Sequence, residues 1–153
     1  MRVFMRDLTP QITYAKLFIR LNQLFLMKFA VVTFGLEDIA EKVSELYPEA
    51  DIFHGLDEIE AEYYEFVFLM SELGGVKGDL LISALESLEC EVVIFCVTST
   101  TLEGLLISRH QVQKILDLKP QFRGAIVSGF LSFEDKMEAV KIILDEKISG
   151  GDG

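Results

Sequence analysis

Short apolar runs alternate with amphipathic stretches over most of the chain. Five runs have the length and continuous hydrophobicity of strands that are buried on both faces. They are Phe29–Phe34, Ala50–Phe53, Phe66–Met70, Glu91–Val97 and Gly124–Val127. Since strands of this kind form parallel sheets with helices on both sides, the pattern predicts an α/β fold. We expect a three-layer Rossmann-like sandwich with a mostly parallel sheet of five or six strands.

The stretches between these runs repeat apolar residues every three or four positions, which is the spacing of amphipathic helices. The predicted helices are 36–47, 79–89, 101–118 and one that follows Ser132. Thr100 and Glu103 fit a capping box at the start of the third helix, and Ser132 is suited to cap the last.

The chain divides into three parts. Residues 27–148 predict a single Rossmann-like domain, and residues 149–153 predict a flexible tail. Residues 1–26 predict an N-terminal amphipathic helix or extension, for which three interpretations remain open. It packs on the domain or on a second copy, it lies on a membrane surface, or natural synthesis begins at Met27, because MKFAVVTFG is a typical opening for a first buried strand.

Charge is unevenly distributed along the chain. The formal net charge is −11, but residues 1–26 carry +3, which leaves −14 for the rest. Binding to a nucleic-acid backbone needs clustered Lys and Arg, so we expect no nucleic-acid partner. No apolar run reaches the roughly 20 residues that span a bilayer, and we expect membrane contact only if residues 10–26 provide it.

Few residues suit metal binding or catalysis. Cys90 and Cys96 have a spacing that fits neither a redox turn nor a zinc site, so we interpret them as buried structural thiols. His54 ends the second strand, whereas His110 lies in the middle of a helix. We therefore expect no metal site and no catalytic residues. We place the protein in the cytoplasm, because no signal-peptide cleavage site follows the N-terminal segment.

The most distinctive loop follows the third strand. It runs from Ser71 to Gly78, contains Gly74 and Gly75, and leads into a helix. Small residues let backbone N–H groups approach an anion, the helix dipole favours negative charge, and Lys77 adds a positive charge. The loop is therefore the candidate phosphate site, in which we expect Gly75 to adopt a positive φ.

Other candidates lie at the ends of neighbouring strands, because ligands of parallel α/β folds bind beyond the carboxyl ends of the strands. Hydroxyl groups follow the fourth strand, and one glycine follows the first. The candidate cofactor-binding residues are therefore Gly35, Gly74, Gly75, Lys77, Gly78, Thr98, Ser99 and Thr100.

Residues 66–104, FVFLMSELGGVKGDLLISALESLECEVVIFCVTSTTLEG, resemble the central part of the tubulin/FtsZ GTPase domain. In that family a strand leads to a GGGTGTG loop, a helix, a strand that ends in VT, and an E-G pair at a helix start. The matching positions are Gly74, Gly75, Gly78, Thr98, Glu103 and Gly104. The last two lie one residue closer to the threonine than the family pattern has them. The resemblance implies GTP or GDP as a ligand.

The chain departs from this family where the family's Gly and Thr contact phosphates. It has Val76, Lys77, Asp79 and Leu80 at those positions, and only Gly35 follows the first strand. The family's acidic catalytic loop has no counterpart in the sequence. The resemblance therefore implies a shortened, divergent relative without GTPase activity, with weak or lost nucleotide binding, that acts through a partner protein or homo-oligomerisation.

A second hypothesis is a small enzyme or sensor of another Rossmann-like or flavodoxin-like family. It would bind a small cationic or neutral metabolite at the strand carboxyl ends, among acidic residues. Sheet order distinguishes the two hypotheses. We expect the order 3-2-1-4-5 for a tubulin/FtsZ relative and 2-1-3-4-5 for a flavodoxin-like fold.

Overall fold

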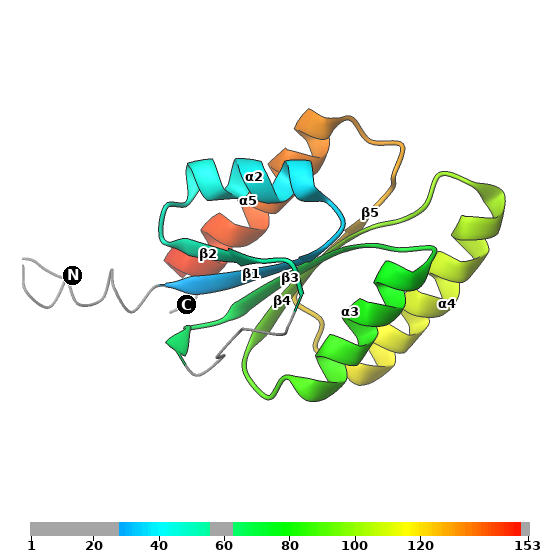
Figure 1. The fold of residues 1–153 in the computed structure, drawn as a ribbon, viewed down its shortest axis with the longest axis horizontal. Helices are drawn as coiled ribbons and strands as arrows, with labels where there is room; N and C mark the ends of the chain where they lie inside the picture. The colour runs from blue at the N-terminus through cyan, green and yellow to red at the C-terminus, as the bar shows by residue number, and fades with distance from the viewer. Residues whose placement is uncertain (1–27, 56–62, 151–153) are drawn as a thin grey trace, which may run out of the picture.

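A computed structural model describes residues 28–55 and 63–150, in which strands and helices alternate (Figure 1). The elements are β1 (Phe29–Phe34), α2 (Glu37–Leu46), β2 (Ala50–Phe53), β3 (Val67–Glu72), α3 (Val76–Ser87), β4 (Val92–Val97), α4 (Leu102–Leu118), β5 (Gly124–Val127) and α5 (Phe133–Gly150). All neighbouring strands are parallel in one five-stranded sheet. The predicted α/β sandwich is confirmed.

Two described helices cover each face of the sheet. Figure 1 shows α2 and α5 on one side and α3 and α4 on the other. The side chains of β1 alternate between two apolar clusters, with Phe29 and Val31 toward α2 and α5, and Ala30 and Val32 toward α3 and α4. Every residue of β1 is buried, because a central parallel strand meets helices on both faces.

The strand order is β2-β1-β3-β4-β5. This is the order expected for a flavodoxin-like fold, and it differs from the 3-2-1-4-5 order expected for a tubulin/FtsZ relative. Val31 of β1 opposes Ile52 of β2 on one side and Phe68 of β3 on the other. The chain leaves β1 toward β2 and then crosses back to β3, so the topological switch point lies between the ends of β1 and β3.

The element boundaries differ from the prediction around the glycine-bearing loop. β3 ends at Glu72 and α3 begins at Val76, whereas the sequence predicted a strand to Met70 and a helix from Asp79. The predicted long loop is therefore reduced to residues 73–75. Five of the eight residues of the candidate phosphate loop, 71, 72 and 76–78, therefore belong to β3 or α3.

The sequence makes predictions about both ends of the chain, residues 1–26 and residues 149–153. The expectations for residues 1–26 lie outside the described residues. α5 continues to Gly150, two residues into the stretch predicted as a tail. Within the described part of the chain, no helix is both long enough and apolar enough to cross a membrane.

Candidate functional site

The switch point lies at Gly35 and Glu72, where β1 and β3 end. Gly35 has a φ of +86°, and a Cβ built on it would lie 2.7 Å from Cδ of Glu72. The Glu72 side chain therefore lies against the backbone of Gly35. Its carboxylate forms an ion pair with Nζ of Lys77 at 3.8 Å. A carboxylate at this place repels phosphate, and it also engages the lysine that the sequence assigned to an anion.

The turn from β1 into α2 is built for a tight reversal. Leu36 caps α2 in the left-handed conformation, with φ 56° and ψ 37°, and its side chain is buried. This conformation costs a residue other than glycine about 1–2 kcal/mol. Thr33 Oγ1 donates a hydrogen bond to the carbonyl of Gly35, and the Leu36 side chain packs in the core, which offsets that cost. The turn has no glycine-rich backbone that could surround a phosphate.

The loop after β3 is tied to α4 by one buried amide. Gln111 is 2% exposed, and its Oε1 accepts a hydrogen bond from the Gly74 N–H at 2.8 Å. Its Nε2 donates to the carbonyl of Gly75 at 2.8 Å and to Oδ1 of Asp79 at 3.1 Å. The Gly74 N–H is thus already engaged within the protein. It is not free to bind a phosphate oxygen.

Packing accounts for two of the three glycines in the candidate phosphate loop. A Cβ on Gly78 would lie 2.3 Å from Oε1 of Gln111, so the glycine lets α3 approach α4 closely. Gly74 has a φ of +104°, and a Cβ there would lie 2.7 Å from Cβ of Ser99. Gly75 has a φ of −165°, which is extended backbone, and the expected positive φ is wrong. Gly74 makes the sharp turn one residue earlier.

Hydroxyl groups after β4 hold the start of α4. The N-cap is Thr101, whose Oγ1 accepts a hydrogen bond from the Gly104 N–H at 3.0 Å. The predicted cap at Thr100 is therefore wrong by one residue. Ser99 Oγ accepts from the Thr101 N–H at 3.2 Å, and the Ser99 N–H donates to Ser108 Oγ at 3.3 Å. These hydroxyls have structural partners within α4 and its cap.

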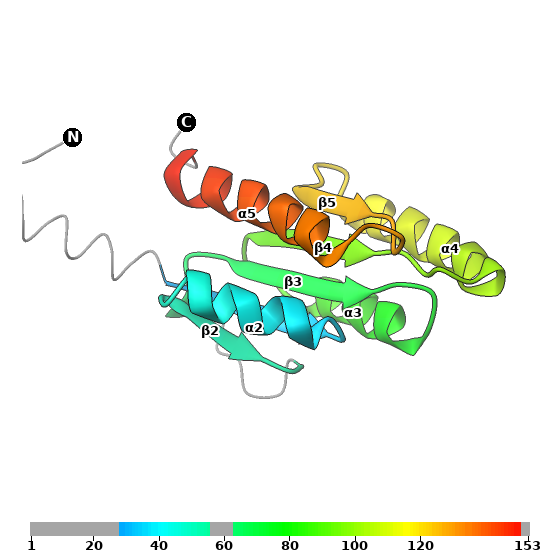
Figure 2. The same cartoon turned by 90° about the horizontal axis from the view of Figure 1, so that it is seen from above.

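The loop after β4 contacts the loops after β3 and β5 at the carboxyl edge of the sheet. Figure 2 shows these three strands pointing toward the same end of the molecule. Gly74 lies against Ser99, and Gly129 of the β5–α5 loop lies against the carbonyl of Thr98 and the methyl group of Thr100. The candidate residues of β3 and β4 are therefore brought together as the sequence predicted.

This edge is acidic. Every described helix carries acidic residues in its first turn, namely Glu37, Asp38, Asp79, Glu103, Glu134 and Asp135. Carboxylates at these positions interact favourably with the positive ends of the helix dipoles. Since the protein supplies its own anions there, a phosphate would meet like charge at each helix start.

Large apolar side chains are exposed around the same three loops. Val76 begins α3, Leu102 begins α4 and Phe130 lies in the β5–α5 loop, with exposed fractions of 73%, 80% and 72%. Leu80 and Leu106 lie one turn further along α3 and α4 and are 48% and 58% exposed. We call these five residues the edge patch. Leu102 and Leu106 lie two residues from the buried Gly104 and Ser108, so they point away from the buried face of α4. Exposed apolar side chains mark a site of interaction where they form a patch.

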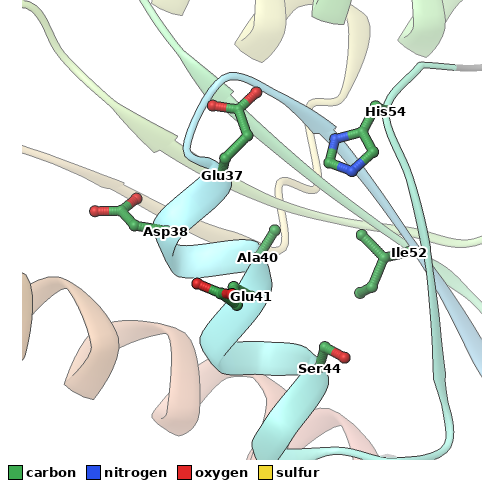
Figure 3. A pocket seen from close by; sticks show the side chains of 7 residues that line it. All are labelled: Glu37, Asp38, Ala40, Glu41, Ser44, Ile52 and His54. Atoms are coloured by element: carbon green, nitrogen blue, oxygen red, sulfur yellow. The ribbon is translucent and has the colours of Figure 1, made fainter.

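A separate hollow of about 550 Å³ lies between α2 and the edge strand β2 (Figure 3). Its lining residues are Glu37, Asp38, Ala40, Glu41, Ser44, Ile52 and His54. Figure 3 shows residues of α2 on one side, and Ile52 and His54 on the other. Figure 3 shows the Asp38 side chain pointing away from Ile52 and His54. The carboxylates of Glu37 and Glu41 favour a cationic or neutral ligand over an anion. Among the residues that the structure describes, no group of three or more His, Cys, Asp or Glu side chains could hold a metal ion.

The two thiols are free and weakly ionisable. Cys96 is buried, and burial raises its pKa to about 12. Cys90 is half-buried rather than buried, and desolvation raises its pKa as well. A thiol that stays protonated is a poor nucleophile and a poor metal ligand, in line with a structural role.

Sequence reasoning missed Gln111, although a signal was present. The buried residues of α4 are Gly104, Ser108, Gln111 and Ile115, which lie on one helical face because they are spaced by four, three and four positions. Three small or polar residues on a buried face indicate a close helix contact with a polar partner.

His110 is exposed on α4, and it is far in sequence from His54, which lines the hollow between α2 and β2.

No protein-family model matches the chain, and no curated protein is significantly similar to it in sequence.

Proposed function

We propose that the protein is a non-catalytic cytoplasmic domain that acts through association with other protein chains, and that the edge patch is its binding surface. The observation that carries this proposal is that three large apolar side chains at this edge are mostly exposed, namely Val76 and Leu102 at the starts of α3 and α4 and Phe130 in the β5–α5 loop. Burial of apolar surface is worth about 25 cal/mol per Å², so a partner that covers these side chains would gain stability from them.

The charges near the edge patch define the partner's chemistry. Glu103 lies between Leu102 and Leu106 in α4, and Asp79 precedes Leu80 in α3. A partner surface with apolar residues at its centre and Lys or Arg around them would match this arrangement. Such charges steer association and select against acidic partners.

In this proposal the binding of GTP or GDP is weak or lost. The Gly74 N–H is hydrogen-bonded to Gln111, Lys77 is paired with Glu72, and the helix starts carry carboxylates. Isothermal titration with each nucleotide should give no submicromolar affinity, and no phosphate should be released above the buffer rate. Submicromolar binding of either nucleotide, or phosphate release above the buffer rate, would contradict this part of the proposal. The resemblance to the tubulin/FtsZ domain stays a prediction, and the strand order counts against it.

The edge patch can be tested by site-specific photocross-linking. A photoreactive amino acid at position 106 should join the full-length protein to a defined partner chain, either a second copy or another protein. The same amino acid at position 142 is the control, because Ile142 is exposed to the same extent, 57% against 58%, but lies on α5. The Leu102→Asp substitution should abolish the adduct from position 106. An adduct that persists, or equal adducts from both positions, would refute the edge patch as the binding surface.

A second candidate function is a sensor or small enzyme that binds a cationic or neutral metabolite. The 2-1-3-4-5 strand order and the acidic hollow between α2 and β2 favour it. A ligand at about 100 times its dissociation constant adds roughly 2.7 kcal/mol of stability, which a thermal-shift screen detects. A ligand of this hollow should lose its effect in the Glu41→Gln variant. If no cationic or neutral metabolite shifts the melting temperature, this candidate is excluded for the compounds tested.

A further inference from the structure

We propose that the hollow between α2 and β2 binds a primary aliphatic amine in its protonated form. This inference rests on the second candidate function, for which it names the class of ligand and the side chains that recognise it. It does not depend on the edge patch.

The hollow lies where folds of this kind bind their ligands. Glu37 begins α2 three residues after β1 ends, and His54 directly follows the last residue of β2. Both residues therefore lie near the carboxyl ends of parallel strands, and ligands of open α/β sheets bind outside these ends. The volume of about 550 Å³ is within the range of small-molecule sites. Position and size together favour a small ligand.

One wall of the hollow is a single face of α2 (Figure 3). Its residues are spaced by three, one and three positions along the helix, and they are Glu37, Ala40, Glu41 and Ser44. The only basic residue of α2 is Lys42, whose Nζ forms an ion pair with Glu45 at 3.4 Å. Among the described residues, no Lys or Arg forms an ion pair with Glu37 or Glu41. The two carboxylates of this wall are therefore available to a cation from solution.

The lining combines these carboxylates with apolar surface. Ala40 lies on the same wall, and Ile52 lies on the opposite side. A protonated primary amine has three N–H donors and no acceptor, so it can donate to both carboxylates while its alkyl chain contacts Ala40 and Ile52. The hollow thus offers a place for each part of such a ligand.

Other cations fit the lining less well. A quaternary ammonium ion has no N–H donor and is typically recognised by aromatic rings, but none of the described lining residues is Phe, Tyr or Trp. The described residues also contain no group of three or more His, Cys, Asp or Glu side chains that could hold a metal ion. The chemistry of the lining therefore selects an amine with N–H donors.

Titration of the full chain with n-pentylamine at neutral pH, followed by amide NMR, tests this inference. We expect the resonances of the residues that line the hollow to shift, with a dissociation constant in the millimolar range, because ion pairs of exposed carboxylates are weak. The double substitution Glu37→Gln with Glu41→Gln should weaken binding by about tenfold or more. Glu45→Gln with Glu49→Gln is the matched control, because it removes the same charge from residues that do not line the hollow. Melting temperatures establish that each variant is folded.

Two analogues of the probe separate its charge from its N–H donors. 1-Pentanol has the same alkyl chain without the positive charge, and pentyltrimethylammonium has the charge without the donors. Both should bind at least about tenfold more weakly than n-pentylamine. Equal binding of the alcohol would show that the carboxylates do not recognise charge, and equal binding of the quaternary ion would show that they do not recognise N–H donors. Either result overturns the inference.

The remaining outcomes separate this inference from the proposed function. If n-pentylamine shifts no resonance of the hollow, or if the control substitutions weaken binding as much as those at positions 37 and 41, the inference is overturned. The edge patch is unaffected by these results, because photocross-linking at position 106 tests it independently. A neutral metabolite that raises the melting temperature, and loses this effect in Glu41→Gln, would support the second candidate function and overturn the amine as its ligand.

Discussion

Replacing Gln111 by Leu should destabilise the loop after β3 without creating a large cavity at position 111. The two side chains are similar in volume, so the change removes polar atoms and leaves no large cavity. Gln111 accepts one hydrogen bond from Gly74 and donates one each to Gly75 and Asp79. Leucine can make none of them. The test therefore isolates the polar connection between α3 and α4.

The expected loss of stability follows from the surroundings of the three partners. Gly74 is half-buried, and a buried N–H left without an acceptor costs about 1–3 kcal/mol. The carbonyl of Gly75 and the carboxylate of Asp79 belong to exposed residues, so water replaces most of what they lose. We expect the free energy of unfolding to fall by about 2 kcal/mol.

Urea unfolding followed by circular dichroism measures the global effect, and amide hydrogen exchange at Gly74 measures the local one. Exchange at Gly74 should accelerate in Gln111→Leu. Gln113→Leu is the control on the same helix, because Gln113 is bonded only to Asp117 at the exposed surface and should change stability by less than about 0.5 kcal/mol. If Gln111→Leu behaves like this control and exchange at Gly74 is unchanged, the connection does not hold the loop.

Three further changes test the core and the helix contact. Phe95 has no exposed surface, so Phe95→Ala should cost about 3–5 kcal/mol in urea unfolding, and a loss under about 1 kcal/mol would contradict its place in a central strand. Gly78→Ala should lose about 1–3 kcal/mol, because the new Cβ meets Gln111; a gain would mean that the higher helix propensity of alanine prevails. Burial raises the pKa of Cys96 from 9.0 to about 12, so the folded state keeps the proton that the unfolded state loses as the pH rises. The free energy of unfolding should therefore fall between these pH values, by at most about 1.4 kcal/mol per pH unit from this group. The fall should be smaller in Cys96→Ala. Parallel curves of unfolding free energy against pH for the two proteins would refute this.

Local pattern determined the elements of this protein. The observed bounds of β1, β2 and β5 are those that the apolar runs predicted, and Ser132 caps the last helix through its Oγ, which accepts from the Asp135 N–H at 3.1 Å. Continuous hydrophobicity reports that both faces of a strand are buried, and a period of three to four residues reports that one face of a helix is buried. Both patterns are formed by residues that are close in sequence, so they can be recognised in a single sequence. The parallel arrangement followed from the same reasoning.

Only the tertiary structure decided the strand order and the chemistry of the loop. Apolar parallel strands of similar composition do not specify which edges pair, and the order 2-1-3-4-5 emerged from packing. The glycines of the loop suggested an anion site, but the Gly74 N–H is bonded to Gln111, 37 residues away in sequence, and Gly78 serves the contact with α4. A backbone N–H binds whichever acceptor the packed helices bring to it. The spacing along α4 indicates a polar residue on a buried face, but which backbone N–H it meets is set by how α3 lies against α4.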